Sequence, residues 1–365
     1  MTYMRALPWQ RFARWAMLAG AAMALCSCAT APAPGSATAE RSPKLANRGV
    51  RDMRAEFRHA FCARLSSKLD CTGILRRLPG EPVRATTARN STITETSATL
   101  AGQYRLAFVP GLLAGCAGST IMPFADTKET LRATGFDARI LSIEGRGSTE
   151  HNADLIARQI IGADPDPRPW IVFGYSKGLP DVLEALIRHP EISGSIAAVV
   201  SYAGAVGGSP LADDSDNLPA ALLEHVPMPG CDRGDGSSIA SLRRDVRHAW
   251  WQAHHTKLRL PFYSLVATAR ADRVSRPLQG SYATLSQTDT LNDGQLIAAD
   301  AVVPGSALLG YVNADHWAIA MPLSEQLPVI SGMFVDDVPR ADLVLAAVQV
   351  ISRHTARSHG QADRP

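Results

Sequence analysis

The stretch IVFGYSKGLPDVLEALI, residues 171–187, decides the fold of this chain of 365 residues. An apolar run is followed by a serine with a glycine two residues away on each side, and then by apolar residues at helical spacing. This order predicts a strand, a sharp turn and a helix. Small residues are needed at such a turn because larger side chains would collide with the neighbouring strand and helix. The turn would expose the hydroxyl of Ser176, as in a nucleophile elbow, so Ser176 is the candidate nucleophile. The alternative is that Ser176 only caps the helix.

Strands and helices alternate along the rest of the chain at the spacing of crossover units. Apolar strand patterns occur at 104–109, 138–143, 196–202, 262–267 and 307–312, and helical patterns occur at 124–134, 152–161 and 339–353. Such alternation predicts an α/β fold with a mostly parallel central sheet flanked by helices. We assign residues 102–206 and 261–355 to this core.

Three segments lie outside the predicted core. Residues 48–101 form an N-terminal extension, with a helix expected at 49–69 and a Thr-rich strand at 92–100. Residues 207–260 are too many for a simple crossover, so we expect a helical cap insertion there. Its apolar stripe from Ile239 to Trp251 is either a lid or a surface helix packed on the core. Residues 356–365 are expected to be a disordered tail.

A serine nucleophile needs an imidazole to take its proton and a carboxylate to orient that imidazole. His316 is the one histidine of ten that follows a final strand and opens a loop, so it is the candidate base. The alternative is a partly buried histidine paired with Asp315. Two aspartates compete for the third role. Asp272 follows the strand at 262–267, which favours it, and Asp293 lies in a turn-forming Asn-Asp-Gly segment.

From residue 104 to residue 317 the sequence resembles the α/β-hydrolase superfamily, and within it the bacterial true lipases. The resemblance rests on residues 109–112 (VPGL), on the GYSKG elbow, and on residues 200–213 (VSYAGAVGGSPLAD). It implies an α/β-hydrolase fold, and it favours Asp293 as the catalytic acid, because the acid of those lipases sits in such an Asn-Asp-Gly turn. It also implies an oxyanion hole made by the backbone N–H groups of Leu112 and Lys177.

The sequence also departs from those lipases. Pro110 and Tyr175 stand where they have histidine, and Lys177 stands where they have glutamine, although backbone donors survive such changes. Ala318 stands where they have a calcium-ligating carboxylate, so we expect no calcium site of that type. Neither a zinc-like Cys/His spacing nor a phosphate-binding loop occurs in the sequence. We therefore expect no metal and no cofactor.

Residues 1–27 resemble the signal sequence of a bacterial lipoprotein. Three arginines precede the apolar run 15–25, which is too short for an ordinary membrane-spanning helix and ends in LCSC at 25–28. By this resemblance Cys28 would become the lipidated first residue, and residues 28–47 would form a flexible tether. Ala29 favours the outer membrane of the cell envelope. The alternative is a plain secretory signal that is cut near Ala29 or Ala31.

The remaining cysteines and the net charge limit the partners. Four cysteines follow Cys28, an even number in an exported protein, and we expect the disulfides Cys62–Cys71 and Cys116–Cys231. The alternative is four free thiols. The formal net charge of +3 comes entirely from Arg5, Arg11 and Arg14, so no nucleic-acid partner is expected.

Together these features predict an envelope-anchored serine hydrolase that cleaves carboxylic (acyl) esters of small molecules or lipids. The alternatives are an acyltransferase or thioesterase with the same residues, and a catalytically inactive envelope binding protein. The sequence does not indicate an oligomeric state.

Overall fold

The computed structural model describes residues 49–65, 69–81, 95–116, 121–163, 165–213, 234 and 237–362, with side chains up to residue 356. Its centre is an eight-stranded sheet with the strand order β1-β9-β8-β7-β6-β3-β5, and β2 lies beside β9. All strands of this path pair in parallel, and β2 pairs antiparallel with β9. The strands are β1 (Arg51–Asp52), β2 (Leu75–Arg76), β3 (Arg105–Val109), β5 (Ala138–Ile140), β6 (Trp170–Ser176), β7 (Ile196–Gly204), β8 (Phe262–Ala267) and β9 (Ala307–Val312). The predicted mostly parallel sheet is confirmed.

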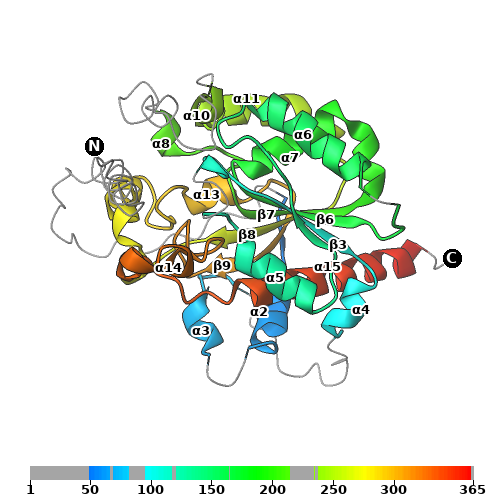
Figure 1. Cartoon of the computed structure of the whole chain (residues 1–365), viewed down its shortest axis with the longest axis horizontal. Coiled ribbons are helices and arrows are strands. Elements are labelled where there is room, and N and C mark those ends of the chain that lie inside the picture. Colours follow the sequence, from blue (N-terminus) through cyan, green and yellow to red (C-terminus); the bar gives the residue numbers. More distant parts are fainter. Residues whose placement is uncertain are drawn as a thin grey trace, which may run out of the picture.

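Helices cover both faces of this sheet (Figure 1). On one face lie α6 (Thr149–Ile161) and α7 (Gly178–Arg188), and on the other lie α2 (Arg54–Cys62), α5 (Ala125–Ala133) and α15 (Arg340–Ala362). Strand residues alternate between the two layers. In β3, for example, Leu106 and Phe108 belong to the same hydrophobic cluster as residues of α15, whereas Ala107 and Val109 belong to that of α6 and α7. The central strands are buried on both faces, which explains their continuous apolar runs.

The N-terminal extension differs from the prediction. The helix expected at 49–69 is the short strand β1 followed by α2, which ends at Cys62. The strand expected at 92–100 is wrong for its described part, because residues 97–101 form helix α4 (Ser97–Ala101). The Thr96 hydroxyl accepts a hydrogen bond from the Thr99 N–H and so caps this helix. Residues 92–94 lie outside the described residues.

The C-terminal helix is longer than predicted. Helix α15 continues to Ala362, whereas the sequence predicted a helix to residue 353 and a disordered tail at 356–365. Residues 363–365 lie outside the described residues.

The predicted cap contains α8 (Pro210–Asp213), α10 (Ser237–Ala240) and α11 (Arg244–His254). The single helix expected from Ile239 to Trp251 is therefore two helices. Trp250 and Trp251 of α11 pack against the layer of α6 and α7, and the Trp250 indole N–H donates to Glu184 of α7 (2.6 Å). This packing matches the interpretation of a surface helix. The cap residues 214–233 and 235–236 lie outside the described residues.

One predicted disulfide is present. Cys62 and Cys71 are bonded and join the end of α2 to α3 (Cys71–Ile74). Cys116 is buried and also disulfide-bonded, but Cys231, its predicted partner, lies outside the described residues. The pairing of Cys116 with Cys231 therefore stays a prediction.

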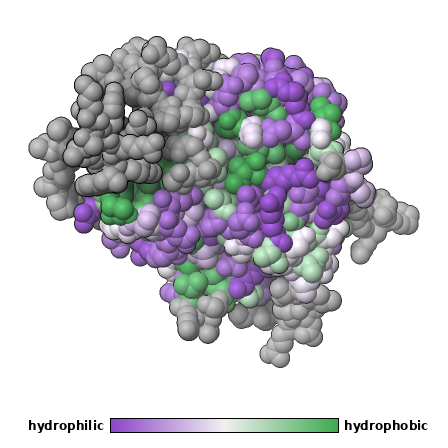
Figure 2. All heavy atoms as spheres, viewed as in Figure 1, coloured by the Kyte–Doolittle hydropathy of each residue, from purple (hydrophilic) through white to green (hydrophobic). Residues whose placement is uncertain are grey.

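Within the described residues, no helix combines the length and apolarity needed to cross a membrane. Figure 2 shows hydrophilic residues over much of the described surface in this view, with apolar residues in smaller patches. The large apolar side chains that the described residues expose are scattered along the chain: Leu69, Ile161, Val246 and Val329. The predicted lipidation site Cys28 and the rest of residues 1–47 lie outside the described residues.

Candidate active site

Ser176 lies on the sharp turn between β6 and α7, as the sequence predicts. Its backbone has a φ of 54°, in the left-handed region that residues other than glycine rarely adopt. The flanking glycines allow the turn to pack tightly. A Cβ on Gly174 would lie 2.7 Å from the Leu179 Cα, and a Cβ on Gly178 would overlap the Val109 carbonyl group. Larger residues at these two positions would push apart β6, α7 and the end of β3.

His316 and Asp293 lie beside Ser176 and form a continuous chain of hydrogen bonds. The His316 Nε2 is 2.9 Å from the Ser176 Oγ, and the His316 Nδ1 is 2.7 Å from the Asp293 Oδ2. Both His316 and Asp293 are buried, with 4% and 1% of their surface exposed. Ser176 is the last residue of β6, His316 lies in the loop after β9, and Asp293 lies in the loop after α12 (Gln279–Ser286). A hydroxyl, an imidazole and a carboxylate in this order can move a proton from oxygen to nitrogen.

The carboxylate of Asp293 is fixed by its own turn. Its Oδ1 accepts the N–H groups of Gln295 (2.8 Å) and Leu296 (2.7 Å), which leaves Oδ2 for the imidazole. The backbone also joins the two loops, because the His316 N–H donates to the Asp293 carbonyl oxygen (2.8 Å). Gly294 has a φ of +89°, so the turn requires glycine at that position. His316 is thus bound to the Asp293 turn twice, through its ring and through its backbone N–H.

Among the described contacts, none joins the His316 ring to the other two aspartates considered above. Asp272 is exposed in the short 3-10 helix Ala271–Arg273, away from the hydrogen bond between His316 and Asp293. Asp315 is buried, and burial raises the pKa of its carboxyl group. It accepts backbone N–H groups from Ser275 (2.7 Å), Trp317 (3.0 Å) and Ala318 (2.8 Å). Asp315 therefore braces the loop that carries His316 rather than pairing with the ring.

The loop after β3 lies directly against the elbow. A Cβ on Gly111 would stand 2.6 Å from the Ser176 Cβ, so only glycine fits there. The Leu113 N–H donates to the Gly145 carbonyl oxygen (2.8 Å), and the Ala114 N–H donates to the Gly111 carbonyl oxygen. Among the described residues, no acceptor pairs with the N–H of Leu112 or Lys177. Leu112 follows the glycine that contacts Ser176, and Lys177 follows Ser176 itself, so both N–H groups belong to the segments that meet at the elbow.

Tyr175 contacts the candidate base, although sequence reasoning noted only that it replaces a histidine. Its hydroxyl donates to the His316 carbonyl oxygen (2.6 Å), and its ring stacks on the imidazole with 5.0 Å between centroids. Burial raises the pKa of the Tyr175 hydroxyl, which therefore stays protonated and keeps donating. The position of Tyr175 directly before the nucleophile is the sequence signal that could have indicated this role.

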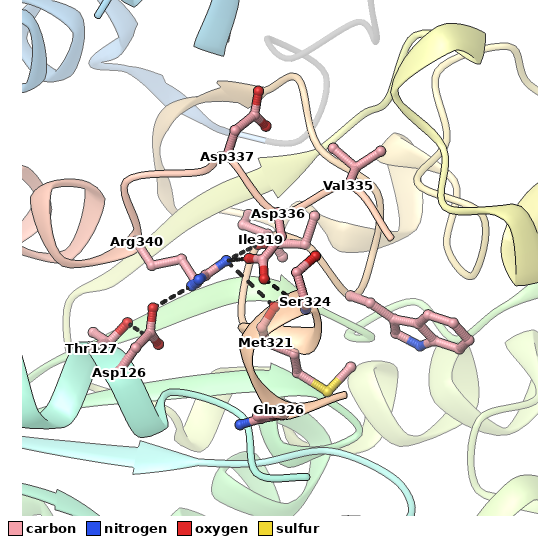
Figure 3. A network of polar contacts seen from close by, with 12 residues as sticks. Asp126, Thr127, Ile319, Met321, Ser324, Gln326, Val335, Asp336, Asp337 and Arg340 are labelled. Carbon is pink, nitrogen blue, oxygen red and sulfur yellow. Dashed lines mark hydrogen bonds and ion pairs between the residues drawn. The ribbon is translucent and has the colours of Figure 1, made fainter. Parts of the chain in front are cut away.

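Arg340, at the start of α15, holds the loop after His316, and nothing in the sequence pointed to it. Its guanidinium binds Asp126 of α5 (2.7 Å) and Asp336 (2.6 Å) and donates to the carbonyl oxygens of Ala318 (3.0 Å) and Met321 (3.4 Å) (Figure 3). Arg340 is buried, so its charge is balanced by these carboxylates rather than by water. The described residues contain no cluster of His, Cys, Asp or Glu side chains that could bind a metal ion.

Solved structures of known proteins match this fold. The structure of the metagenomic carboxyl esterase MGS0156 is 33% identical in sequence, with a TM-score of 0.75, over 92% of this chain and 99% of that chain. The mature lipase BlEst2 of Bacillus licheniformis is 20% identical, with a TM-score of 0.46, over 59% of this chain and 85% of its own. Phospholipase PlaB of Legionella pneumophila is 15% identical, with a TM-score of 0.38, over 55% of this chain and 46% of its own. The last two TM-scores are too low to carry an argument.

Searches with family models and among curated proteins gave no match. The first structural relative is nevertheless similar over almost its whole length, at 33% sequence identity. Its esterase fold agrees with the parallel sheet and the covering helices described above. The chain therefore belongs to the α/β-hydrolase superfamily, in the family of this carboxyl esterase.

Proposed function

We propose that this protein is a serine hydrolase that cleaves carboxylic esters, with Ser176 as nucleophile, His316 as general base and Asp293 as the group that orients the base. The observation that carries the proposal is the pair of hydrogen bonds, of 2.9 Å and 2.7 Å, that links the hydroxyl to the imidazole and the imidazole to the carboxylate. The fold shared with a carboxyl esterase supports the same class of substrate.

The reaction then has two stages. The Ser176 Oγ attacks the ester carbonyl carbon while the His316 Nε2 takes its proton, and the same imidazole returns that proton to the leaving alcohol. Water, activated by His316, attacks the acyl-enzyme and releases the acid. In both stages the N–H groups of Leu112 and Lys177 bind the negative oxygen of the tetrahedral intermediate. Asp293 keeps the proton on Nδ1, so that Nε2 faces the hydroxyl as an acceptor.

Hydrolysis of nitrophenyl esters of increasing acyl length tests this proposal. The purified wild-type protein should release nitrophenol, and Ser176→Ala should lower kcat/KM by at least about 10³-fold, because the nucleophile is removed. Ser195→Ala changes an exposed serine in the turn before β7 and serves as the matched control, with wild-type rates expected. Equal rates in Ser176→Ala and the wild type would refute the serine mechanism.

Adding an alcohol to the same assay separates hydrolysis from acyl transfer. A hydrolase gives mainly free acid, whereas an acyltransferase gives mainly the new ester. We propose hydrolysis, because the related protein of known structure is an esterase.

We further propose that the protein is anchored to the cell envelope through a lipid on Cys28, as the LCSC segment at 25–28 suggests. Cells that express the full chain with a labelled fatty acid should incorporate the label, and Cys28→Ser should abolish incorporation and release the protein from the membrane fraction. Equal labelling of both forms would refute lipidation at Cys28.

A further inference from the structure

A buried ion pair lies next to the elbow, and the mechanism above does not use it. The Lys177 Nζ is 2.8 Å and 3.1 Å from the two carboxylate oxygens of Asp181, one turn further along α7. The side chains are 1% and 0% exposed. Ion pairs with this spacing usually lie on helix surfaces, where water solvates both charges. Here both side chains are removed from water, and one of them belongs to the residue that follows the nucleophile.

Asn152 of α6 extends the ion pair to a second loop. Its amide nitrogen donates to the Asp181 Oδ2 (2.9 Å) and to the Glu144 carbonyl oxygen (3.1 Å). Its amide oxygen accepts the Glu144 N–H (3.0 Å). Asn152 is completely buried, so both ends of its amide are used without water. The ion pair therefore fixes Asn152, and Asn152 fixes the loop at residues 144–147.

That loop in turn supports the loop after β3. The Gly145 carbonyl oxygen accepts the Leu113 N–H (2.8 Å), and a Cβ on Gly145 would overlap the backbone of Ala114. The backbone of residues 113 and 114 thus rests directly on residue 145, with no side chain between them. Leu112, whose N–H is one proposed oxyanion donor, precedes this contact by one residue.

We propose that Lys177, Asp181 and Asn152 are positioning residues that hold the two oxyanion donors, the N–H groups of Leu112 and Lys177, at a fixed separation. This inference rests on the proposed function. One donor belongs to Lys177 itself, whose side chain is tied to Asp181. The other belongs to the loop that Asn152 reaches through Glu144 and Gly145. The network therefore joins the two halves of the oxyanion hole behind Ser176.

A change in the position of these donors should affect stabilisation of the transition state more than binding of the substrate. Preorganised donors stabilise the charge that develops on the oxygen, and misplaced donors lose most of that effect. Loosening the network should therefore lower kcat and leave KM nearly unchanged. A purely structural role would instead lower the thermal midpoint, with no specific effect on transition-state binding.

The experiment compares Asp181→Asn, Lys177→Met, Lys177→Arg and Asn152→Leu with the wild type. Asp181→Asn keeps the shape of the side chain and serves if Lys177→Met fails to fold. We measure kcat and KM on a short nitrophenyl ester, the thermal midpoint, and the affinity of a trifluoromethyl ketone, whose adduct with Ser176 carries the oxyanion. In Asp181→Asn, Lys177→Met and Asn152→Leu, kcat should fall about tenfold or more, with KM within about twofold. The affinity of the ketone should fall by the same factor as kcat. Lys177→Arg, which keeps the cation, should recover part of kcat and part of the ketone affinity.

Arg58→Met provides the matched control, because it breaks a partly buried ion pair far along the chain from the elbow. Arg58 of α2 binds Glu81 (2.7 Å and 3.0 Å), and the two side chains are 13% and 1% exposed. This variant should lower the thermal midpoint without a selective loss of ketone affinity. Wild-type kcat and ketone affinity in folded Asp181→Asn and Asn152→Leu would overturn the inference. Losses of kcat and ketone affinity in these variants that were no larger than those in Arg58→Met would also overturn it.

A separate measurement distinguishes failure of this inference from failure of the proposed function. A fluorophosphonate should label Ser176 in the wild type and give no adduct in Ser176→Ala. If that labelling is absent, the proposed function fails. If labelling is present and the network variants keep their kcat, only the positioning role fails.

Discussion

Gly111→Ala should damage catalysis far more than a single added methyl group normally does. A Cβ at this position would stand 2.6 Å from the Ser176 Cβ, 3.1 Å from the Ser176 Oγ and 3.2 Å from the Tyr175 carbonyl oxygen. Carbon atoms that are not bonded prefer a separation of about 3.5–4.0 Å, so the new contact is too short by about 1 Å. Two of the three contacted atoms are Ser176 Cβ and a backbone oxygen of β6, which cannot move aside by rotating a flexible side chain. Either the elbow or the loop after β3 must therefore shift.

The size of the effect follows from that shift. A displacement of about 1 Å between reacting groups costs on the order of 10²-fold in rate, and overpacking costs about 1–3 kcal/mol of stability. We therefore expect kcat/KM for a short nitrophenyl ester to fall about 100-fold in a protein that remains folded. Gly111 does not have a positive φ, so the expected loss of activity comes from the steric contact and not from backbone strain on replacing glycine.

Gly194→Ala is the control for this prediction. A Cβ at Gly194 meets no atom within 4 Å, and this variant should keep the wild-type rate. Circular dichroism and the thermal midpoint establish that both variants are folded. If Gly111→Ala kept the kcat/KM of the wild type, the close contact between the loop and Ser176 would be refuted, and with it the basis for placing an oxyanion donor at Leu112.

Four further predictions test other parts of the molecule. Asp293→Asn should lower kcat by about 10³- to 10⁴-fold, because the amide cannot hold the required tautomer of His316, whereas Asp272→Asn should stay within about twofold of the wild type; the reverse order in steady-state kinetics would make Asp272 the acid. Arg340→Met leaves the carboxylates of Asp126 and Asp336 without their cation and should cost about 3–5 kcal/mol in urea unfolding, so an unchanged midpoint would contradict the role drawn in Figure 3. The double variant Cys62→Ser with Cys71→Ser opens a loop with a sequence separation of 9 and should cost about 2.5 kcal/mol by the same method, with no loss expected if the bond does not form. The hydrogen bond and charge of Arg273 hold the pKa of Asp337 below its usual range, so this pair stabilises the fold above about pH 4 and loses its contribution as the pH falls through the lowered pKa. Asp337→Asn should therefore be less stable than the wild type by less than about 1 kcal/mol at neutral pH. A stability difference that did not shrink on acidification would exclude the pair.

The parts of the fold that sequence reasoning predicted are those that local chemistry determines. The elbow needs an apolar strand, small residues around one serine and an amphipathic helix, and all three occupy consecutive residues at 171–187. The strands of the parallel sheet were recognisable because they are buried on both faces and therefore read as apolar runs. The position of His316 followed from the order of strands, since it comes directly after β9.

The remaining errors concern features that depend on distant contacts. Thr-rich residues before α4 suggest a strand by composition, but Thr96 caps a helix that packs on the core through Leu100. Residues 51–52 form a strand because they pair with β9, a contact with residues 307–308 that no local pattern reveals. The choice between Asp272 and Asp293 depended on which loop reaches back to β9, and the residues alone favoured Asp272 because it follows β8.

The supporting network of the site was also hidden in the sequence. Lys177 and Arg340 are charged residues that would normally lie on the surface, and their burial depends on partners from other elements, such as Asn152 and Asp126. An i,i+4 pair such as Lys177 and Asp181 is common on exposed helix faces. Only the packing of α6 against α7 shows that this pair faces inward.

Covalent labelling tests the central claim most directly. The purified protein is treated with a fluorophosphonate, and the adduct is located by mass spectrometry after digestion. Our account predicts one equivalent of label on Ser176, loss of ester hydrolysis in proportion to labelling, and much slower labelling of His316→Ala. Label on a different residue, or ester hydrolysis that survives complete labelling of Ser176, would contradict it.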